Sequence, residues 1–177
     1  MTPDNTSRQM IERPPVSEGP LALRERALEP WLRVDWQKFW LTVRGREWRS
    51  LALVPAGQGA PPDFTLTIAV SLARTGMMHL GVPIRVVDAT RVPLRQMMEL
   101  IDEVNNCIAT GDLVIIALGT TSESPVTVSV AQAADSALLC VMMERMAVAD
   151  AKTTVDHVGQ QKFIGSVVFH PNGESAG

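Results

Sequence analysis

Five short apolar runs, separated by segments with helical patterning, constrain the fold of this chain more than any other feature. The runs cover residues 50–56, 83–89, 112–119, 136–143 and 163–171. Helices are predicted between them, over residues 64–76, 93–111, 124–135 and 148–161. Strands that alternate with helices require parallel crossover connections. The sequence therefore predicts an α/β fold of three layers, α/β/α, with helices on both faces of a mainly parallel sheet.

The remaining residues divide the chain into a tail, a helical lead-in and the main domain. Residues 1–20 are polar, contain four prolines and show no periodicity, which predicts a disordered N-terminal tail. Residues 21–49 predict a helical lead-in, with one helix over 21–29 and a second over 35–45. The α/β domain is expected over residues 50–171, and residues 172–177 are expected to form a flexible tail.

All the tryptophans of the chain lie in the predicted lead-in, at Trp31, Trp36, Trp40 and Trp48. Trp36 and Trp40 fall on one apolar face of the predicted helix, which favours packing against the sheet. The alternative is a partner-binding surface, because tryptophan is enriched at interface hot spots.

Charge and composition exclude several classes of function. A net charge of −3 argues against a nucleic-acid binder that works through bulk basicity. The three histidines are scattered, with no pair at metal-ligand spacing, so no metal site is expected. The first residues lack the pattern of a signal peptide, and no apolar run reaches the ~18 residues of a membrane span. A cytoplasmic location is therefore expected.

Four stretches of sequence, in this order, resemble the deviant Walker family of P-loop ATPases. They are the helix over 35–45 with RSLALVPAGQG, then TIAVSLARTG with PIRVVDATRVP, then GDLVIIALGTT, and finally AADSALLCV with IGSVVFHP. The resemblance is greatest to the cytoplasmic kinase-like domains of bacterial exopolysaccharide export. The septum-site and chromosome-partitioning ATPases are close relatives. The resemblance covers residues 34–170 and implies a P-loop NTPase-like fold.

The resemblance also implies the remnant of a nucleotide site. Its residues are Gly57, Gln58, Gly59, Thr65, Thr67 and Asp88. The two glycines belong to the glycine-rich loop, and Thr65 or Thr67 stands where the hydroxyl that binds magnesium should be. Asp88 takes the place of the aspartate at the end of the family's second strand.

The loop departs from the family pattern in its charge and in its main chain. A working loop supplies N–H groups and a lysine to the phosphates. Here no lysine occurs between Lys38 and Lys152. Pro61 and Pro62 offer no N–H, and Asp63 would repel a polyphosphate. We therefore expect the loop to be unable to support phosphoryl transfer.

Two further residues that phosphoryl transfer or autophosphorylation would need are missing from the sequence. The strand that should end in a metal-binding aspartate runs instead into Ala117 and Leu118. The kinase-like relatives phosphorylate tyrosines of their own tail, and this chain has no tyrosine. Phosphoryl transfer depends on positioning and charge neutralisation, so we expect no catalytic residue and no cofactor.

The resemblance then implies a pseudokinase: an inactive interaction or regulatory partner in bacterial exopolysaccharide biosynthesis and export, of the capsule or holdfast type. The implied partner is a membrane-embedded polysaccharide chain-length or export protein, through which the chain would reach the inner membrane. A homodimer, or a heterodimer with an active relative, is also implied. No nucleic-acid partner is expected.

Two alternatives stay open. In the first, the chain is an atypical ATPase of the septum-site and partitioning type that keeps weak binding of ATP and magnesium, with Arg85, Arg91 or Arg95 replacing the lysine. In the second, Gly57 and Gly59 belong to a Rossmann-type dinucleotide site in which Asp88 binds a ribose. The second needs a further glycine where Pro62 stands.

Overall fold

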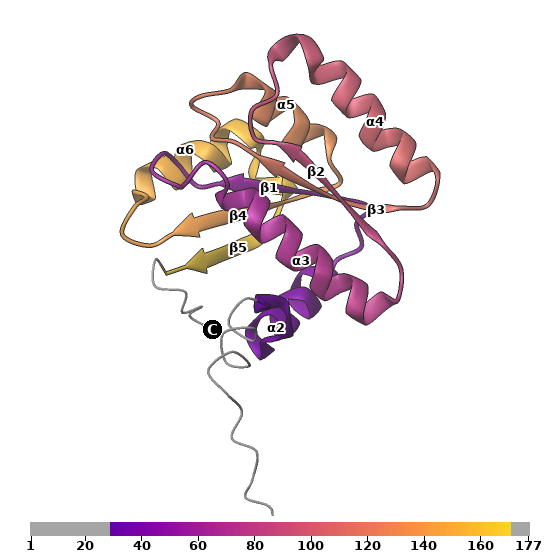
Figure 1. Cartoon of the computed structure of the whole chain (residues 1–177). Helices are drawn as coiled ribbons and strands as arrows, with labels where there is room; N and C mark the ends of the chain where they lie inside the picture. Colours follow the sequence, from indigo (N-terminus) through magenta and orange to yellow (C-terminus); the bar gives the residue numbers. More distant parts are fainter. Residues whose placement is uncertain (1–28, 171–177) are drawn as a thin grey trace, which may run out of the picture.

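The computed structural model describes residues 29–170, which form a five-stranded sheet with helices on both faces (Figure 1). The strands are β1 Ser50–Pro55, β2 Ile84–Ala89, β3 Leu113–Leu118, β4 Ser136–Met142 and β5 Phe163–Phe169. Their order is β2-β3-β1-β4-β5, and every neighbouring pair is parallel. The predicted parallel α/β fold is confirmed. The predicted tails and most of the predicted helix over 21–29 lie outside the described residues.

The helices form two layers around the sheet. They are η1 Pro30–Leu32, α2 Val34–Arg44, α3 Phe64–Leu80, η2 Leu94–Gln96, α4 Met97–Ala109, α5 Pro125–Ala133, α6 Val148–Val158 and η3 Gln160–Lys162. One face of the sheet carries α2 and α3, and the other carries α4, α5 and α6 (Figure 1). In the described part of the chain, no helix has both the length and the apolarity to cross a bilayer.

The central strand explains why the apolar runs are continuous rather than alternating. Every residue of β1 is buried. Leu51 and Leu53 pack in the core under α2 and α3, while Ala52 and Val54 pack under α4, α5 and α6. A strand covered on both faces needs apolar side chains at successive positions.

Helix α3 extends further than the sequence pattern predicts. Gly76 was expected to end it, but the helix continues to Leu80 and is capped by Gly81, whose φ of 68° is left-handed. Gly76 has a packing role instead. A Cβ atom there would lie 2.4 Å from the side chain of Ile84 and 2.5 Å from that of Trp40, so only glycine allows α3 to approach them.

Two other helices are shorter than predicted. The segment over 93–111 divides into η2 and α4. Helix α6 ends at Val158 rather than near residue 161, because Gly159 leaves the helical conformation with a φ of 100°.

Candidate functional site

The loop over residues 56–63 joins β1 to α3 at the carboxyl ends of the strands, where open α/β folds bind their ligands. Because β1 lies between β3 and β4, the loops that follow those two strands flank it. The Nε2 of Gln58 donates a hydrogen bond of 3.1 Å to the Oγ of Ser122 in the loop after β3. A cavity of about 280 Å³ opens at this end of the sheet, and Pro61, Thr65 and Arg91 are among its lining residues.

Both glycines of the loop are explained by close packing. A Cβ atom on Gly57 would lie 2.5 Å from the Cβ of Asp150, in the first turn of α6. A Cβ atom on Gly59 would lie 2.6 Å from the main-chain oxygen of Arg145, and Gly59 has a φ of 96°. The glycines would therefore be needed at these positions even without a phosphate to bind.

Three main-chain N–H groups of the loop take no part in the hydrogen bonds of the described fold. Within residues 29–170, those of Gly57, Gln58 and Gly59 have no protein hydrogen-bond partner. Consecutive free N–H groups can form an anion site when their charge environment allows it.

The charge environment opposes a polyphosphate. The carboxylate of Asp150 reaches the loop, with one oxygen 3.1 Å from where a Cβ of Gly57 would be. Glu123 lines the cavity, and Asp63 stands immediately before α3. Arg91 is the single basic side chain among the residues that line this cavity. The sequence did not predict that Glu123, in the loop after β3, and Asp150, in α6, would lie near this loop, because both are distant from it along the chain.

The threonines of α3 differ in their surroundings. Thr65 is buried, and its hydroxyl donates a hydrogen bond of 2.7 Å to the main-chain oxygen of Leu118. This bond ties the start of α3 to the end of β3. Thr67 is exposed. The hydroxyl of Thr65 therefore serves the fold, and only Thr65 of the two lines the cavity.

The position expected to hold a metal-binding aspartate is part of the core. Ala117 is fully buried in the apolar cluster under α2 and α3. A carboxylate there would lose its hydration without a charged partner. Within residues 29–170, no group of three or more histidine, cysteine, aspartate or glutamate side chains is placed to hold a metal ion.

Asp88 stabilises a turn. Its Oδ1 accepts hydrogen bonds from the main-chain N–H of Thr90 at 3.0 Å and from the hydroxyl of Thr90 at 2.7 Å. This is the common side-chain stabilisation of a turn by aspartate. The strand order also opposes the dinucleotide alternative, which needs the second strand beside the first. Here β3 separates β2 from β1.

The three arginines considered as replacements for the lysine lie in different places. The Nε of Arg85 donates to Asp112 at 2.7 Å, at the amino end of the sheet. That hydrogen bond and the charge of Asp112 raise the pKa of Arg85. Arg95 lies in η2 and does not line the cavity. Only Arg91 of the three lines the cavity.

The tryptophans divide into two pairs. Trp40 and Trp48 are buried and meet edge to face, with ring centroids 6.2 Å apart. No partner can reach them, so the partner-binding prediction is corrected for these two, and packing explains them. Trp36 is half-buried against Phe169, and Trp31 is half-buried under the guanidinium of Arg74, 4.2 Å from its ring centre.

No protein-family model matches this chain, and no curated protein is significantly similar to it in sequence.

Proposed function

We propose that this chain is a catalytically inactive relative of the P-loop ATPases, a pseudokinase that acts through its surfaces. The observation that carries the proposal is the surroundings of the loop after β1. The loop joins the first strand to a helix at the carboxyl end of the sheet, where Asp150 lies against it, Glu123 lines the adjoining cavity and no lysine lines that cavity.

Electrostatics explains why such a loop would fail as an ATPase. Near a protein surface, two like charges 4 Å apart repel by about 4 kcal/mol. A polyphosphate on the free N–H groups would lie beside Asp150, and Glu123 lines the adjoining cavity. Magnesium would lack a carboxylate ligand, because the buried Ala117 stands at the position expected for the aspartate. Both the ground state and the transition state of phosphoryl transfer would lack charge neutralisation.

The buried framework, in contrast, is complete. Cores pack on both faces of the sheet, and in the described residues no buried side-chain nitrogen or oxygen lacks a hydrogen-bond partner. A chain that retains its fold without its chemistry fits an interaction or regulatory role. From the sequence resemblance, we propose that this role lies in bacterial exopolysaccharide biosynthesis and export. The partner would be a membrane-embedded chain-length or export protein that holds the chain at the cytoplasmic side of the inner membrane.

A second candidate has one observation in its favour. The free N–H groups of residues 57–59, with Arg91 at the cavity, could retain weak binding of ATP and magnesium. A homodimer or a heterodimer with an active relative is compatible with either candidate.

The partner proposal can be tested with the full chain. The cytoplasmic segments of a chain-length or export protein encoded beside this gene would be immobilised, and binding would be measured with and without ATP. We expect saturable binding that is the same in both conditions. Absence of binding, or binding that requires ATP, would contradict the proposed function.

A further inference from the structure

Strand β2 lies at an edge of the sheet. Within residues 29–170 its only partner strand is β3, which pairs with it along its whole length, from Ile84 opposite Leu113 to Ala89 opposite Leu118. The main-chain N–H and C=O groups on the other side of β2 therefore have no strand to bind. Such an edge can accept a further strand.

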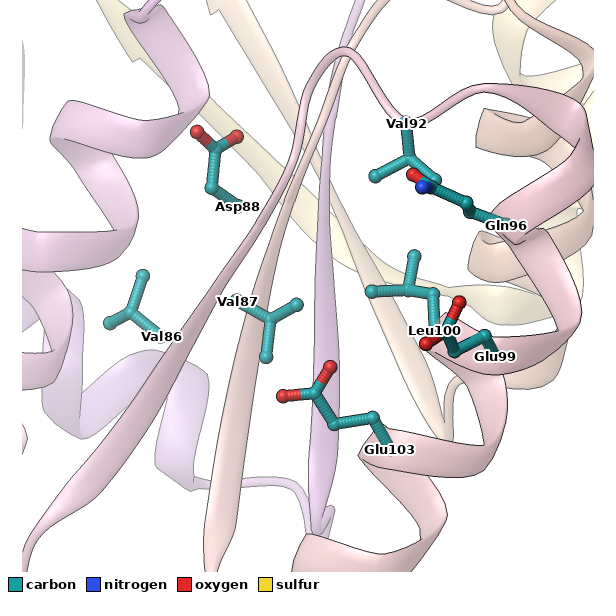
Figure 2. A pocket seen from close by; sticks show the side chains of 8 residues that line it. All are labelled: Val86, Val87, Asp88, Val92, Gln96, Glu99, Leu100 and Glu103. Carbon is teal, nitrogen blue, oxygen red and sulfur yellow. The ribbon is translucent and has the colours of Figure 1, made fainter.

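A groove of about 430 Å³ follows this edge, between β2 and α4 (Figure 2). Val87 points toward α4, whereas Val86 and Asp88 point to the other side of the strand (Figure 2). Residues from both faces of β2 thus line one groove. The groove must therefore run along the edge itself, where the unpaired main-chain groups lie.

The groove combines an apolar floor with an acidic rim. The carboxylates of Glu99 and Glu103 lie on its α4 side, Asp88 adds an acidic residue on the other side of the strand, and none of its lining residues is basic. The Glu103 carboxylate reaches toward Val87 (Figure 2). The nearby Arg85 donates to Asp112 outside the groove. The floor consists of Val86, Val87, Val92 and Leu100.

We propose that the free edge of β2 binds an extended segment of a partner protein, with lysine or arginine alternating with apolar residues. The segment would add a sixth strand through main-chain hydrogen bonds. Its side chains alternate in direction, so its cations would meet Glu99 and Glu103 on the face of α4 while its apolar residues cover Val86 on the other face. The proposal rests on the proposed function only in taking the chain to act through partners.

Two other occupants fit the groove less well. A second copy would pair its β2 antiparallel about a two-fold axis, which would bring the acidic rims of both copies to the same face and make them repel. The first 28 residues of this chain contain four arginines and four acidic residues, so they carry no net positive charge to complement the rim.

The test measures peptide binding and amide hydrogen exchange in the full chain, with three probe peptides. The first alternates lysine and valine, the second alternates glutamate and valine, and the third has the composition of the first in two blocks, lysines then valines. We expect saturable binding of the first peptide alone, with slower hydrogen exchange at the amides of residues 84–89. Equal binding of the alternating and block peptides, or protection elsewhere, would overturn the proposal.

Charge reversal supplies the matched variants. Glu99→Lys with Glu103→Lys should weaken binding of the lysine–valine peptide by at least about tenfold. Asp102→Lys, on the same helix but outside the groove, should change it by less than about twofold. An equal loss in both variants would show an effect of net charge alone and would overturn the proposed site.

The free chain distinguishes the other occupants. Protection of those β2 amides that do not face β3, at every protein concentration and before peptide is added, would show that a segment of the chain itself covers the edge. Protection that grows with protein concentration would show a second copy. Either result would contradict the proposal that a partner strand binds β2. Neither result would bear on the proposed loss of ATP binding, which nucleotide titration tests separately.

Discussion

The two ends of the parallel strands use their charged residues differently. At the amino end, a carboxylate oxygen of Asp135 accepts hydrogen bonds from the main-chain N–H groups of Arg49 at 2.8 Å and Ser50 at 2.9 Å. Close by, the ammonium of Lys162 donates to the main-chain oxygen of Ala134 at 2.8 Å. These groups join the segments before β1, β4 and β5, so charge at this end stabilises the fold.

At the carboxyl end, Asp88 stabilises a local turn, but the charged side chains around the loop after β1 are not engaged in this way. Asp63, Arg91, Glu123 and Asp150 form no ion pair with any residue of the described range 29–170. Ligands of α/β folds bind at this end, so unpaired groups are expected of a binding site. Here, however, most of them carry the wrong sign for phosphate. The charged side chains around the loop after β1 therefore do not hold the described fold together, and most of them would repel a phosphate.

The largest effect is expected at the amino end. Asp135→Ala removes the acceptor for two main-chain N–H groups, and we expect the free energy of unfolding to fall by about 2 kcal/mol. Urea denaturation measures the change. Asp102→Ala, an exposed carboxylate on α4, is the control and should have little effect.

The same carboxylate should make stability depend on acid pH. Burial alone would raise the pKa of Asp135, but hydrogen bonds from the main-chain N–H groups of Ser50 and Arg49 hold it below its ordinary value. A lowered pKa in the folded state contributes stability above the unfolded pKa of about 3.9, and this is lost as pH falls through the folded pKa. In the Asp135→Asn variant, the free energy of unfolding should therefore depend less on pH in this acid range. An unchanged acid profile would contradict the assigned role.

The next effect tests whether Thr65 serves the fold or a ligand. Thr65→Val keeps the shape but leaves the main-chain oxygen of Leu118 without its donor, which should cost about 1–2 kcal/mol of unfolding free energy. Thr67→Val, at an exposed position, should cost less than about 0.5 kcal/mol. Equal stability of the two variants would show that the buried hydrogen bond contributes nothing.

The smallest effect is expected at the cavity. Arg91→Ala and Glu123→Ala should each change the free energy of unfolding by less than about 0.5 kcal/mol, because both side chains are exposed and unpaired within residues 29–170. Thermal and urea denaturation of both variants check this. A cost above about 1 kcal/mol would show that charged side chains at the carboxyl end also stabilise the fold.

The elements of the fold followed from local patterns, while their arrangement did not. Runs of apolar residues predicted every strand, and β1 shows why: a strand buried on both faces cannot alternate. The strand order could not be predicted, because a crossover can return beside any strand. That order is what separates Asp88 from the first strand.

The roles of two glycines also could not be predicted from local sequence patterns. In the sequence, Gly76 resembles a helix end, and only the packing of Trp40 and Ile84 against it shows why it lies inside α3. Gly57 likewise suggests a phosphate loop until Asp150, from a distant helix, is found against it. Periodicity reports which face a residue occupies, but it says nothing about contacts between segments far apart in the chain.

Calorimetric titration of the full chain with ATP and magnesium measures directly whether the loop after β1 binds a nucleotide. With carboxylates around the loop and no lysine or metal-binding aspartate, we expect no saturable heat at ligand concentrations up to about 1 mM, which excludes binding stronger than about −4 kcal/mol. Saturable binding in the micromolar range, weakened by Arg91→Ala, would contradict the account and establish the loop as a working nucleotide site.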